Sequence, residues 1–479
     1  MNSNSNNFTK TKILCTIGPA TSSAEMIRSM MKAGMDGVRL NFSHGSHEFH
    51  KSVFENIHKA CVDENLPLAV LIDLQGPKIR IGELAQPEIY IASGDHIRIT
   101  IDDVIGNKDL ISTSYKNLIK DSVVGNRILI DDGLIKLRII SKESSSLLCM
   151  IEDGGILRPK KGMNLPEMNL STPSVTEKDF NDLEFALTHR VDYIALSFVR
   201  KAEDVFKLKQ WLKERNHETP VIAKIEKPEA VKNFEAILAV SDGIMVARGD
   251  LGVEVAPQEV PIIQKKIILR CNAVGKLVIT ATQMLESMVN NPVPTRAEAS
   301  DVANAVWDGT DVVMLSAETS VGKFPIQAIS MMNNILINSD SHLPEMPEHK
   351  IEVPFNLEEN LFDSVGRAIT MMSKQVYAAA IVVLTNKGRT AINFAKFRPQ
   401  AKIIALSDSF DTMNKLCLRW GVIPVFMESI DKEHMAIDKA KKLIIENGCV
   451  NRDDVVIFAA GAPYSDKSRV NWLRIEVIE

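Results

Sequence analysis

The sequence predicts an α/β fold: a (β/α)8 barrel that carries an inserted all-β domain and is followed by an open-sheet α/β domain. Three observations lead to this prediction. Short β-branched segments alternate with amphipathic stretches of helical length, which is typical of a parallel sheet. Eight such strand segments occur in the first two thirds of the chain, and eight is the number that closes a barrel. One long interruption and the last third of the chain follow different patterns.

The eight predicted barrel strands end in Gly, Pro or polar residues. They lie within Lys12–Pro19, Met35–His44, Leu68–Gly76, Val191–Arg200, Pro220–Pro228, Ser241–Asp250, Lys276–Leu285 and Asp311–Ser320. Most are followed by a helical pattern. In the stretch from 202 to 215, for example, Val205, Leu208 and Leu212 share one face.

The interruption falls after the third strand, from Ile81 to Arg158. Its alternating apolar segments and its turn signals, such as Ser93-Gly94 and Asp132-Gly133, predict an all-β domain. The barrel then comprises residues 1–80 and 159–342, with the insertion at 81–158. An insertion at this point lies beside the C-terminal mouth of the barrel, where it can act as a lid.

An acidic, Pro-containing segment from Leu343 to Pro354 predicts a linker. Beyond it, a helical pattern to about Val376 and alternating strands and helices predict a second α/β domain, which gives a boundary of 343–479. The strands are expected at Ala378–Leu384, Lys402–Leu406, Ile423–Met427 and Val455–Ala460, with helices from Thr390 and through Ile444.

Composition narrows the classes of function. The 479 residues contain 61 Asp and Glu against 56 Lys and Arg, a net charge of −5. This balance gives no excess of positive charge for binding nucleic acid, so a small-molecule partner is favoured.

The six cysteines form no CxxC pair, which indicates reduced thiols and no zinc site. The longest apolar run, Tyr377–Leu384, is far shorter than the ~20 residues that cross a membrane. The polar first twelve residues lack a signal-peptide core. We therefore expect a soluble, cytoplasmic protein without a membrane partner.

Polar residues follow the predicted strands at the C-terminal face, where the active site of such a barrel is assembled. With the two-residue period of a strand, Arg39, Asn41 and Ser43 point the same way. The later strands contribute pairs of the same kind. These pairs are Lys224 and Glu226, Arg248 and Asp250, Thr280 and Thr282, and Ser316 and Glu318.

A single charged residue at a strand end is more often a solvated terminus or a structural ion pair than a functional group. Convergence of several in one mouth is harder to explain structurally, because each buried charge is costly unless it is paired or ligated. Glu226 and Asp250 suit Mg²⁺, while Arg39, Lys224 and Arg80 suit a phosphate or carboxylate. These residues favour a Mg²⁺-dependent enzyme acting on a small phosphorylated acid.

At these residues the sequence closely resembles the pyruvate kinase family. The resemblance spans the barrel, the insertion and the C-terminal domain. The matching stretches are Thr11-Lys12, Cys15–Ala20, Arg39–Gly45, Gly76–Arg80, Lys161-Gly162, Lys224–Glu226, Met245–Gly252, Ala281–Met288, Pro294–Glu298 and Leu315–Thr319.

The resemblance implies transfer of the phosphoryl group of phosphoenolpyruvate to ADP, which yields ATP and pyruvate, in a homotetramer. It assigns Mg²⁺ to Glu226 and Asp250, and stabilisation of the phosphoryl group to Lys224. The remaining roles follow by position. Substrate binding falls to Arg39, Gly249 and Thr282, nucleotide contacts to Asn41, His44, Arg80 and Lys161, and a candidate proton relay to Thr282, Ser316 and Glu318.

One position departs from potassium-requiring relatives, which have an acidic residue where this chain has Lys78 and a Thr-Lys pair where it has Leu74-Gln75. The other ligand positions for the monovalent cation are present; they are Asn41, Ser43 and Asp73. An ammonium near that place repels a second cation. We therefore expect an enzyme that does not require K⁺.

The segment from Thr385 through Asn386, Lys387, Gly388 and Arg389 to Thr390 stands at a predicted helix start. Hydroxyls, backbone N–H groups and two cations there suit a phosphate. A capped helix start is an equally good interpretation of the residues alone. The resemblance favours the first, because this loop matches the one that holds sugar-phosphate activators in the family; a sugar phosphate or a nucleotide is the expected effector.

Two other classes of function remain open. A Mg²⁺-dependent aldolase or lyase acting on pyruvate also uses a barrel with a Glu/Asp metal pair, but the inserted domain and Lys224 favour the kinase. A non-catalytic sensor of sugar phosphates explains the C-terminal loop but not the polar barrel mouth.

Overall fold

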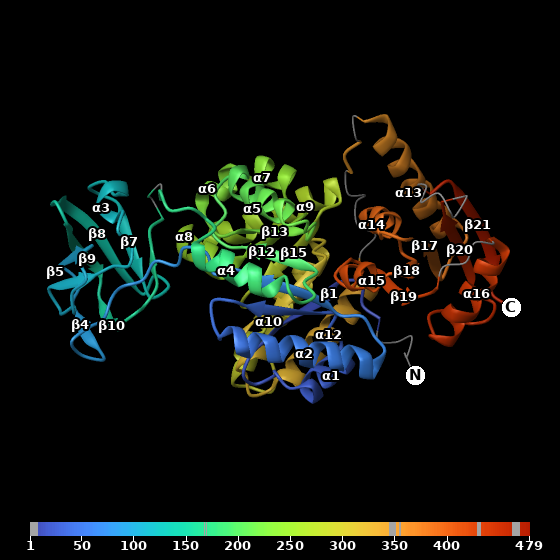
Figure 1. The fold of residues 1–479 in the computed structure, drawn as a ribbon, viewed down its shortest axis with the longest axis horizontal. Helices are drawn as coiled ribbons and strands as arrows, with labels where there is room; N and C mark the ends of the chain where they lie inside the picture. Colours follow the sequence, from blue (N-terminus) through green and yellow to red (C-terminus); the bar gives the residue numbers. More distant parts are fainter. Residues whose placement is uncertain are drawn as a thin grey trace.

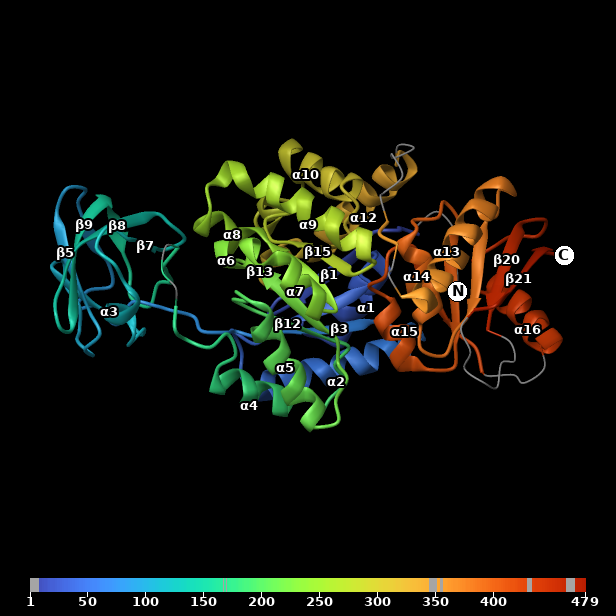
Figure 2. The ribbon, with the colours of Figure 1, turned by 90° about the horizontal axis from the view of Figure 1, so that it is seen from above.

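The structure, a computed structural model, describes residues 8–166, 168, 170–343, 351–353, 356–428, 433–461 and 470–479. It consists of three parts in a row (Figure 1). The barrel occupies the middle, the inserted domain stands at one end, and the C-terminal domain packs at the other. Figure 2 shows the same order from above, with the inserted domain joined to the barrel by extended chain.

Eight parallel strands close the barrel, and each of the eight predicted segments contains one of them. The strands are β1 (Lys12–Ile17), β2 (Gly37–Asn41), β3 (Ala69–Asp73), β12 (Tyr193–Leu196), β13 (Val221–Ile225), β14 (Gly243–Ala247), β15 (Leu277–Ala281) and β16 (Val312–Leu315). The predicted barrel is confirmed, since β1 pairs with both β2 and β16.

Helices surround the barrel, most of them on its outside and α8 at its mouth (Figure 1). They are α1 (Ala24–Ala33), α2 (His47–Glu64), α4 (Glu177–Ala186), α5 (Ala202–Glu214), α6 (Pro228–Lys232), α7 (Phe234–Val240), α8 (Arg248–Glu254), α9 (Val260–Val274), α10 (Arg296–Trp307), α11 (Ala317–Ser320) and α12 (Pro325–Ser341), with 3₁₀ turns at Pro257–Glu259 and Glu286–Val289. Side-chain caps fix where several begin. Ser23, Ser46, Thr176 and Thr295 each accept a backbone N–H of the first turn.

Alternate residues of each barrel strand face two different cores. Leu14, Leu71 and Ile222 belong to a cluster inside the barrel, while Ile13, Ile72 and Val221 belong to the layer between the strands and the helices. The two-residue period therefore decides which polar side chains reach the interior.

Aspartates at the start of every second strand hold the N-terminal end of the barrel, which we call the floor. Each accepts the backbone N–H of a residue at the start of the preceding strand, at 2.8 Å, and pairs with a cation. The four sets are Asp36 with Ile13 and Lys12, Asp192 with Val70 and Arg190, Asp242 with Val221 and Lys209, and Asp311 with Val278 and Arg398. One device thus recurs four times around the closed sheet.

The inserted domain is built from β-strands around its own core. Its strands are β4 (Ile89–Ile91), β5 (His96–Thr100), β6 (Leu110–Ser112), β7 (Arg127–Ile130), β8 (Ile135–Lys142), β9 (Ser146–Asp153), β10 (Gly155–Leu157) and β11 (Met163–Asn164). A six-stranded sheet runs in the order β11-β7-β8-β9-β5-β6, and β4 pairs with β10. One helical turn, α3 (Leu118–Asp121), departs from the expected all-β content.

The C-terminal domain has five strands in the order β19-β18-β17-β20-β21. Its elements are α13 (Leu357–Gln375), β17 (Ala380–Leu384), α14 (Arg389–Lys396), β18 (Lys402–Ser407), α15 (Phe410–Leu416), β19 (Val422–Phe426), α16 (Glu433–Glu446), β20 (Val455–Ala460) and β21 (Trp472–Val477). The open sheet is as predicted, while α15 and the antiparallel edge strand β21 are additional. Most of the expected linker before α13 lies outside the described residues.

The C-terminal domain closes the barrel floor. Cys417 and Leu418, just after α15, join the cluster inside the barrel, and the Tyr193 hydroxyl donates to the Lys415 carbonyl at 2.7 Å. With the floor plugged, the mouth is the end of the barrel at which polar side chains gather. Within the part of the chain that the structure describes, no helix is long and apolar enough to cross a membrane.

Candidate active site at the barrel mouth

Lys224 stands at the centre of the mouth. It lies near the end of β13, and its side chain is 11% exposed. Its Nζ lies 3.1 Å from Asp73 Oδ1, 2.8 Å from Glu226 Oε1 and 2.7 Å from Ser197 Oγ. Burial opposes the charged ammonium, but the two carboxylates outweigh it and raise the pKa of Lys224. A permanently charged lysine is therefore held inside the barrel.

Asp73 links this lysine to Arg39. Its Oδ2 lies 2.7 Å from the Arg39 guanidinium, and Arg39 also donates to Thr16 Oγ1 at 3.0 Å. Burial favours the neutral acid, yet Lys224 and Arg39 lower the pKa of Asp73. Arg39 and Lys224 are thus joined through Asp73, and with Glu226 on Lys224 two cations and two carboxylates form one buried network.

The strand period explains this convergence. Arg39, Asp73 and Lys224 have the parity of the residues that face inward lower in the same strands, such as Leu71 and Ile222. The predicted meeting of Arg39 with Lys224 is what the structure shows.

The sequence interpretation missed two members of the network. Ser197 follows β12, and Thr16 lies near the end of β1. Both have inward parity at a strand end, and that signal was available in the sequence. Hydroxyl residues are common at strand ends, however, and only the contacts to Lys224 and Arg39 distinguish these two.

Glu226 is buried beside Lys224. Its Oε2 accepts the Phe198 N–H at 2.7 Å, whereas its Oε1 has the ion pair with Lys224 but no hydrogen bond. Burial raises the pKa of Glu226, and the nearby charge of Asp250 raises it further. A carboxylate with a free lone pair next to a second carboxylate fits a divalent cation. Among the described residues, no three His, Cys, Asp or Glu side chains gather into a complete metal site.

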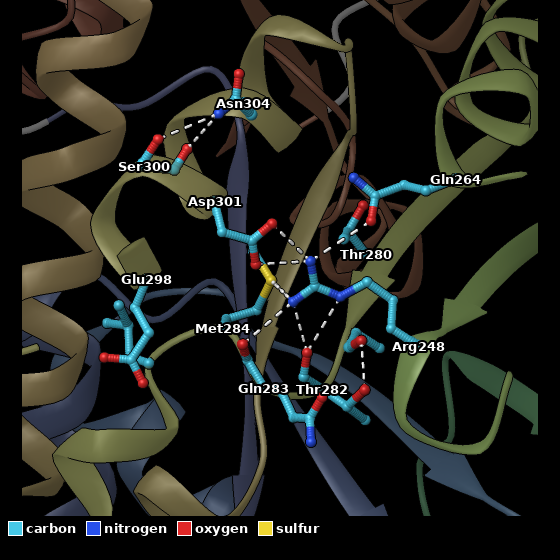
Figure 3. A network of polar contacts seen from close by, with 12 residues as sticks. Arg248, Gln264, Thr280, Thr282, Gln283, Met284, Glu298, Ser300, Asp301 and Asn304 are labelled. Carbon is cyan, nitrogen blue, oxygen red and sulfur yellow. Dashed lines mark hydrogen bonds and ion pairs between the residues drawn. The ribbon is translucent and has the colours of Figure 1, made fainter. Parts of the chain in front are cut away.

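The sixth strand does not present Arg248 and Asp250 on one face, so that expectation was wrong. β14 ends at Ala247, and helix α8 begins at Arg248. A helix turns successive side chains by about 100° each, so the two residues diverge. Asp250 is exposed at the mouth, and its charge acts to raise the pKa values of Lys78 and Lys224. Arg248 points away from the mouth, toward Asp301 on α10 (Figure 3).

The end of the seventh strand is also divided. Thr280 shares the parity of Val278 in the outer layer and donates to Thr310 there, so its expected place in the mouth was wrong. Thr282, beyond the end of β15, lies at the mouth. Its hydroxyl accepts the Gly249 N–H at 2.8 Å and donates to the Ala281 carbonyl.

Glu318 lies on α11, just beyond the end of β16, and is fully buried. Its two carboxylate oxygens accept the N–H groups of Leu285 and Ser316, at 3.1 and 2.6 Å. Burial raises the pKa of Glu318. The Ser316 hydroxyl is buried without a hydrogen-bond partner. Glu318 therefore joins the chain beyond β15 to the chain beyond β16, with an uncommitted hydroxyl beside it.

The rim of the mouth is basic and reaches the inserted domain. Arg80 pairs through its backbone with Gly162 and donates to the Lys160 carbonyl at 2.8 Å, while Lys161 lies 2.9 Å from Asp131 of the inserted domain. Burial lowers the pKa of His44, and the charges of Lys78, Arg80 and Arg39 lower it further. These cations therefore share one region.

Lys78 belongs to the same rim. Partial burial lowers the pKa of Lys78, as does Arg80, whereas Asp250 and Asp132 act in the opposite direction. Of the expected cation-site positions, Asp73 is committed to Arg39 and Lys224, and Asn41 Oδ1 accepts the Ser43 N–H at 3.1 Å. Lys78 and Arg80 therefore both place positive charge in this region.

A second candidate site lies in the C-terminal domain. The loop before α14 borders a pocket of about 1000 Å³, which is also lined by the end of α9 in the barrel and by the two residues that follow it, Gly275 and Lys276. Lining side chains from the loop are Thr385, Asn386, Lys387, Arg389 and Thr390. Gly388 has φ +75° and caps the helix, while Thr385 Oγ1 accepts its N–H at 3.0 Å.

Comparison with known proteins agrees with this architecture. Residues 8–329 match the pyruvate kinase barrel domain and residues 363–476 the pyruvate kinase alpha/beta domain. Pyruvate kinases of Staphylococcus epidermidis and Staphylococcus aureus are each 41% identical over 473 residues, which is 98% of this chain and 80% of the relative.

A solved structure extends the match to the whole fold. The crystal structure of a pyruvate kinase from Cryptosporidium parvum is 34% identical, with a TM-score of 0.92, and the match covers 100% of this chain and 98% of that one. Barrel, insertion and C-terminal domain thus occur together in proteins of one kind, and the chain belongs to the pyruvate kinase family.

Proposed function

We propose that the barrel mouth is where this chain transfers the phosphoryl group of phosphoenolpyruvate to ADP. The P–O bond to the enol oxygen breaks as a P–O bond to the β-phosphate of ADP forms. The enolpyruvate left behind takes a proton at its methylene carbon to give pyruvate. The observation that carries this proposal is Lys224, a buried and charged lysine held between Asp73 and Glu226.

In this proposal Lys224 stabilises the phosphoryl group in flight, because phosphoryl transfer depends mainly on positioning and on positive charge around the equatorial oxygens. Arg39 binds the substrate with Gly249 and Thr282. We assign the nucleotide to the rim. There a backbone β-bridge between Arg80 and Gly162 holds Arg80 close to Lys161. Asn41 and His44 complete the nucleotide contacts.

Glu226 and Asp250 are the residues that would hold Mg²⁺. The free lone pair of the buried Glu226 Oε1 supports this assignment. The charge of Asp250 also acts to raise the pKa of Glu226, which indicates that the two carboxylates lie in the same region. When bound, the ion neutralises charge on the phosphate oxygens and orients them. Thr282, Ser316 and Glu318 form the candidate route for the proton, with the unpartnered Ser316 hydroxyl as its supporting feature.

A lactate dehydrogenase-coupled assay with phosphoenolpyruvate, ADP and Mg²⁺ tests the reaction. Oxidation of NADH that requires both substrates is the expected result. A lyase would instead release pyruvate from a larger acid without ADP. A non-catalytic sensor would release no pyruvate, so no NADH would be oxidised. Either outcome contradicts the proposed reaction.

We also propose that the enzyme does not need K⁺, because Lys78, which is influenced by both Arg80 and Asp250, already supplies a positive charge in this region. The wild type should show the same kcat/KM with KCl and with a tetraalkylammonium salt at equal ionic strength. Lys78→Glu should create a dependence on K⁺. Strong activation of the wild type by K⁺ would contradict this proposal.

The C-terminal pocket is proposed to bind a phosphorylated effector. Lys387 and Arg389 supply positive charge, and the first turn of α14 supplies N–H groups. Four acidic side chains line the same pocket and balance its four basic ones, so its charge favours one phosphate over two; they are Glu352, Glu359, Asp363 and Asp408 against Lys276, Lys387, Arg389 and Lys396. Ribose 5-phosphate, AMP and glucose 6-phosphate are therefore preferred over fructose 1,6-bisphosphate.

The effector should lower the apparent KM for phosphoenolpyruvate, through a coupling free energy of about 1–3 kcal/mol. The double variant Lys387→Ala, Arg389→Ala should lose this activation and keep its unactivated kcat within about threefold, because neither side chain lies at the mouth. If the variant still responds fully, the effector binds elsewhere. A homotetramer in the cytoplasm is the proposed setting, which sedimentation and cell fractionation test.

A further inference from the structure

Arg248 lies next to the mouth but does not face it. It is the first residue of α8, its side chain is 11% exposed, and Nη1 lies 2.9 and 2.7 Å from the two carboxylate oxygens of Asp301 (Figure 3). Asp301 belongs to α10, so the pair joins the helix that carries Gly249 and Asp250 to the outer layer of the barrel. The ion pair uses only part of the guanidinium.

The remaining donors of Arg248 hold the chain beyond β15. Nε and Nη2 lie 3.2 and 2.6 Å from the Thr282 carbonyl, and Nη2 lies 3.3 Å from the Gln283 carbonyl. Nη2 also lies 2.8 Å from Met284 Sδ. Three consecutive residues are thus fixed by one side chain, which Figure 3 shows converging on the guanidinium.

The backbone conformation of Thr282 and Gln283 depends on such contacts. Thr282 and Gln283 have φ values of +69° and +54°, in the left-handed region that side chains other than glycine rarely adopt. Such conformations persist only when surrounding contacts impose them, and they concentrate at functional sites. Arg248 supplies contacts to the carbonyls of both residues.

These contacts also determine the position of the Thr282 hydroxyl. Thr282 Oγ1 accepts the Gly249 N–H at 2.8 Å, and a Cβ on Gly249 would lie 3.4 Å from it. The start of α8 and the end of β15 are therefore joined twice, by the Arg248 side chain to the Thr282 carbonyl and by the Gly249 backbone to the Thr282 hydroxyl. A small shift of either element moves that hydroxyl relative to Asp250.

We propose that Arg248 is a positioning residue for the reaction, anchored by Asp301, which sets the place of the Thr282 hydroxyl against Gly249 and Asp250. This rests on the role proposed above for Thr282 in substrate binding and proton delivery. A displacement of about 1 Å at such a site costs on the order of 10²-fold in rate. A purely structural ion pair between α8 and α10 has no such effect on the chemistry.

Arg248→Lys is the principal test. Lysine keeps a positive charge beside Asp301, but one ammonium lacks the planar fork that reaches Asp301 and two carbonyls together. We expect kcat to fall by about 10- to 100-fold, while the KM for ADP changes by less than about threefold. The solvent deuterium isotope effect on kcat should rise, since protonation of enolpyruvate becomes slower. In Asp301→Asn the amide oxygen still accepts a hydrogen bond from Arg248, so kcat should fall less than in Arg248→Lys.

Lys265→Met is the matched control. The Lys265–Asp308 ion pair joins α9 to the residue that follows α10, and Lys265 is exposed. Its loss should leave kcat and the isotope effect unchanged. Size-exclusion chromatography of every variant shows whether assembly has changed, and Asp301→Asn provides the same readouts if Arg248→Lys does not fold.

The positioning role is overturned if Arg248→Lys keeps kcat within about twofold of the wild type, or if kcat falls with an unchanged isotope effect. Thr282→Ala, measured in parallel, separates this inference from the proposed function. Near-wild-type kcat in Thr282→Ala contradicts the role given to Thr282. A large loss in Thr282→Ala with none in Arg248→Lys contradicts only the role given to Arg248.

Discussion

The mouth and the floor of the barrel both bury carboxylates, and they use them differently. At the floor, Asp192 and Asp311 each accept a backbone N–H of the neighbouring strand. At the mouth, Asp73 is held by the side chains of Arg39 and Lys224, and Glu226 keeps one oxygen without a hydrogen bond. The floor aspartates are thus bound to the backbone of a neighbouring strand, whereas Asp73 at the mouth is bound by side chains whose charges a ligand can share.

The difference teaches how to separate stability from function in one barrel. A side chain that satisfies a buried backbone N–H cannot be removed without leaving that group unpaired. Side chains that satisfy one another at an open mouth are available to substrates. Floor variants should therefore change stability with little effect on kcat, and mouth variants should change kcat far more than stability explains.

The largest expected effect is at Lys224. Lys224→Met removes the positive charge between donor and acceptor, so kcat should fall on the order of 10²-fold or more while phosphoenolpyruvate still binds. Steady-state kinetics and calorimetric titration with phosphoenolpyruvate measure the two quantities. A variant with near-wild-type kcat would remove Lys224 from the mechanism.

The next effect is at the floor. Asp311→Ala leaves the Val278 N–H and one contact of Arg398 unsatisfied, which costs about 1–3 kcal/mol. The melting temperature should fall by about 5 °C, with kcat within about twofold of the wild type when measured well below the transition. A comparable loss of kcat would break the division between floor and mouth.

The smallest effect concerns Asp192, whose carboxyl is buried. Burial raises the pKa of Asp192 to about 6, above its usual value near 4. The folded state therefore binds the proton more tightly than the unfolded state does, and this residue's contribution to stability falls as pH rises from about 4 to 6. Asp192→Asn should melt about 3 °C above the wild type at pH 7 and equally at pH 4. A uniform loss of stability at both values would contradict this.

The sequence was sufficient to predict the barrel, because each strand combines a buried β-branched run with a polar end. It also predicted the meeting of Arg39 with Lys224, which follows from the strand period. The period fails once a strand has ended. β14 ends one residue before Arg248, and no pattern in the sequence marks that point, so Arg248 and Asp250 were placed together wrongly.

The recurring aspartate at the floor was visible in the sequence but not interpretable there. Asp36, Asp192, Asp242 and Asp311 each precede a strand, as do many residues of turns. Only the register between neighbouring strands shows that their carboxylates reach a backbone N–H across the sheet. Similarly, Thr280 looked like a mouth residue until its partner Thr310 placed it in the outer layer.

One matched pair of variants tests the division between mouth and floor most directly. Asp73→Asn and Asp36→Asn make the same chemical change, at the mouth end of β3 and at the floor start of β2. Measured side by side in the coupled assay, Asp73→Asn should lose at least about 30-fold in kcat, because it no longer neutralises and holds Arg39 and Lys224. Asp36→Asn should stay within about twofold of the wild type. Equal losses in the two variants would contradict the account.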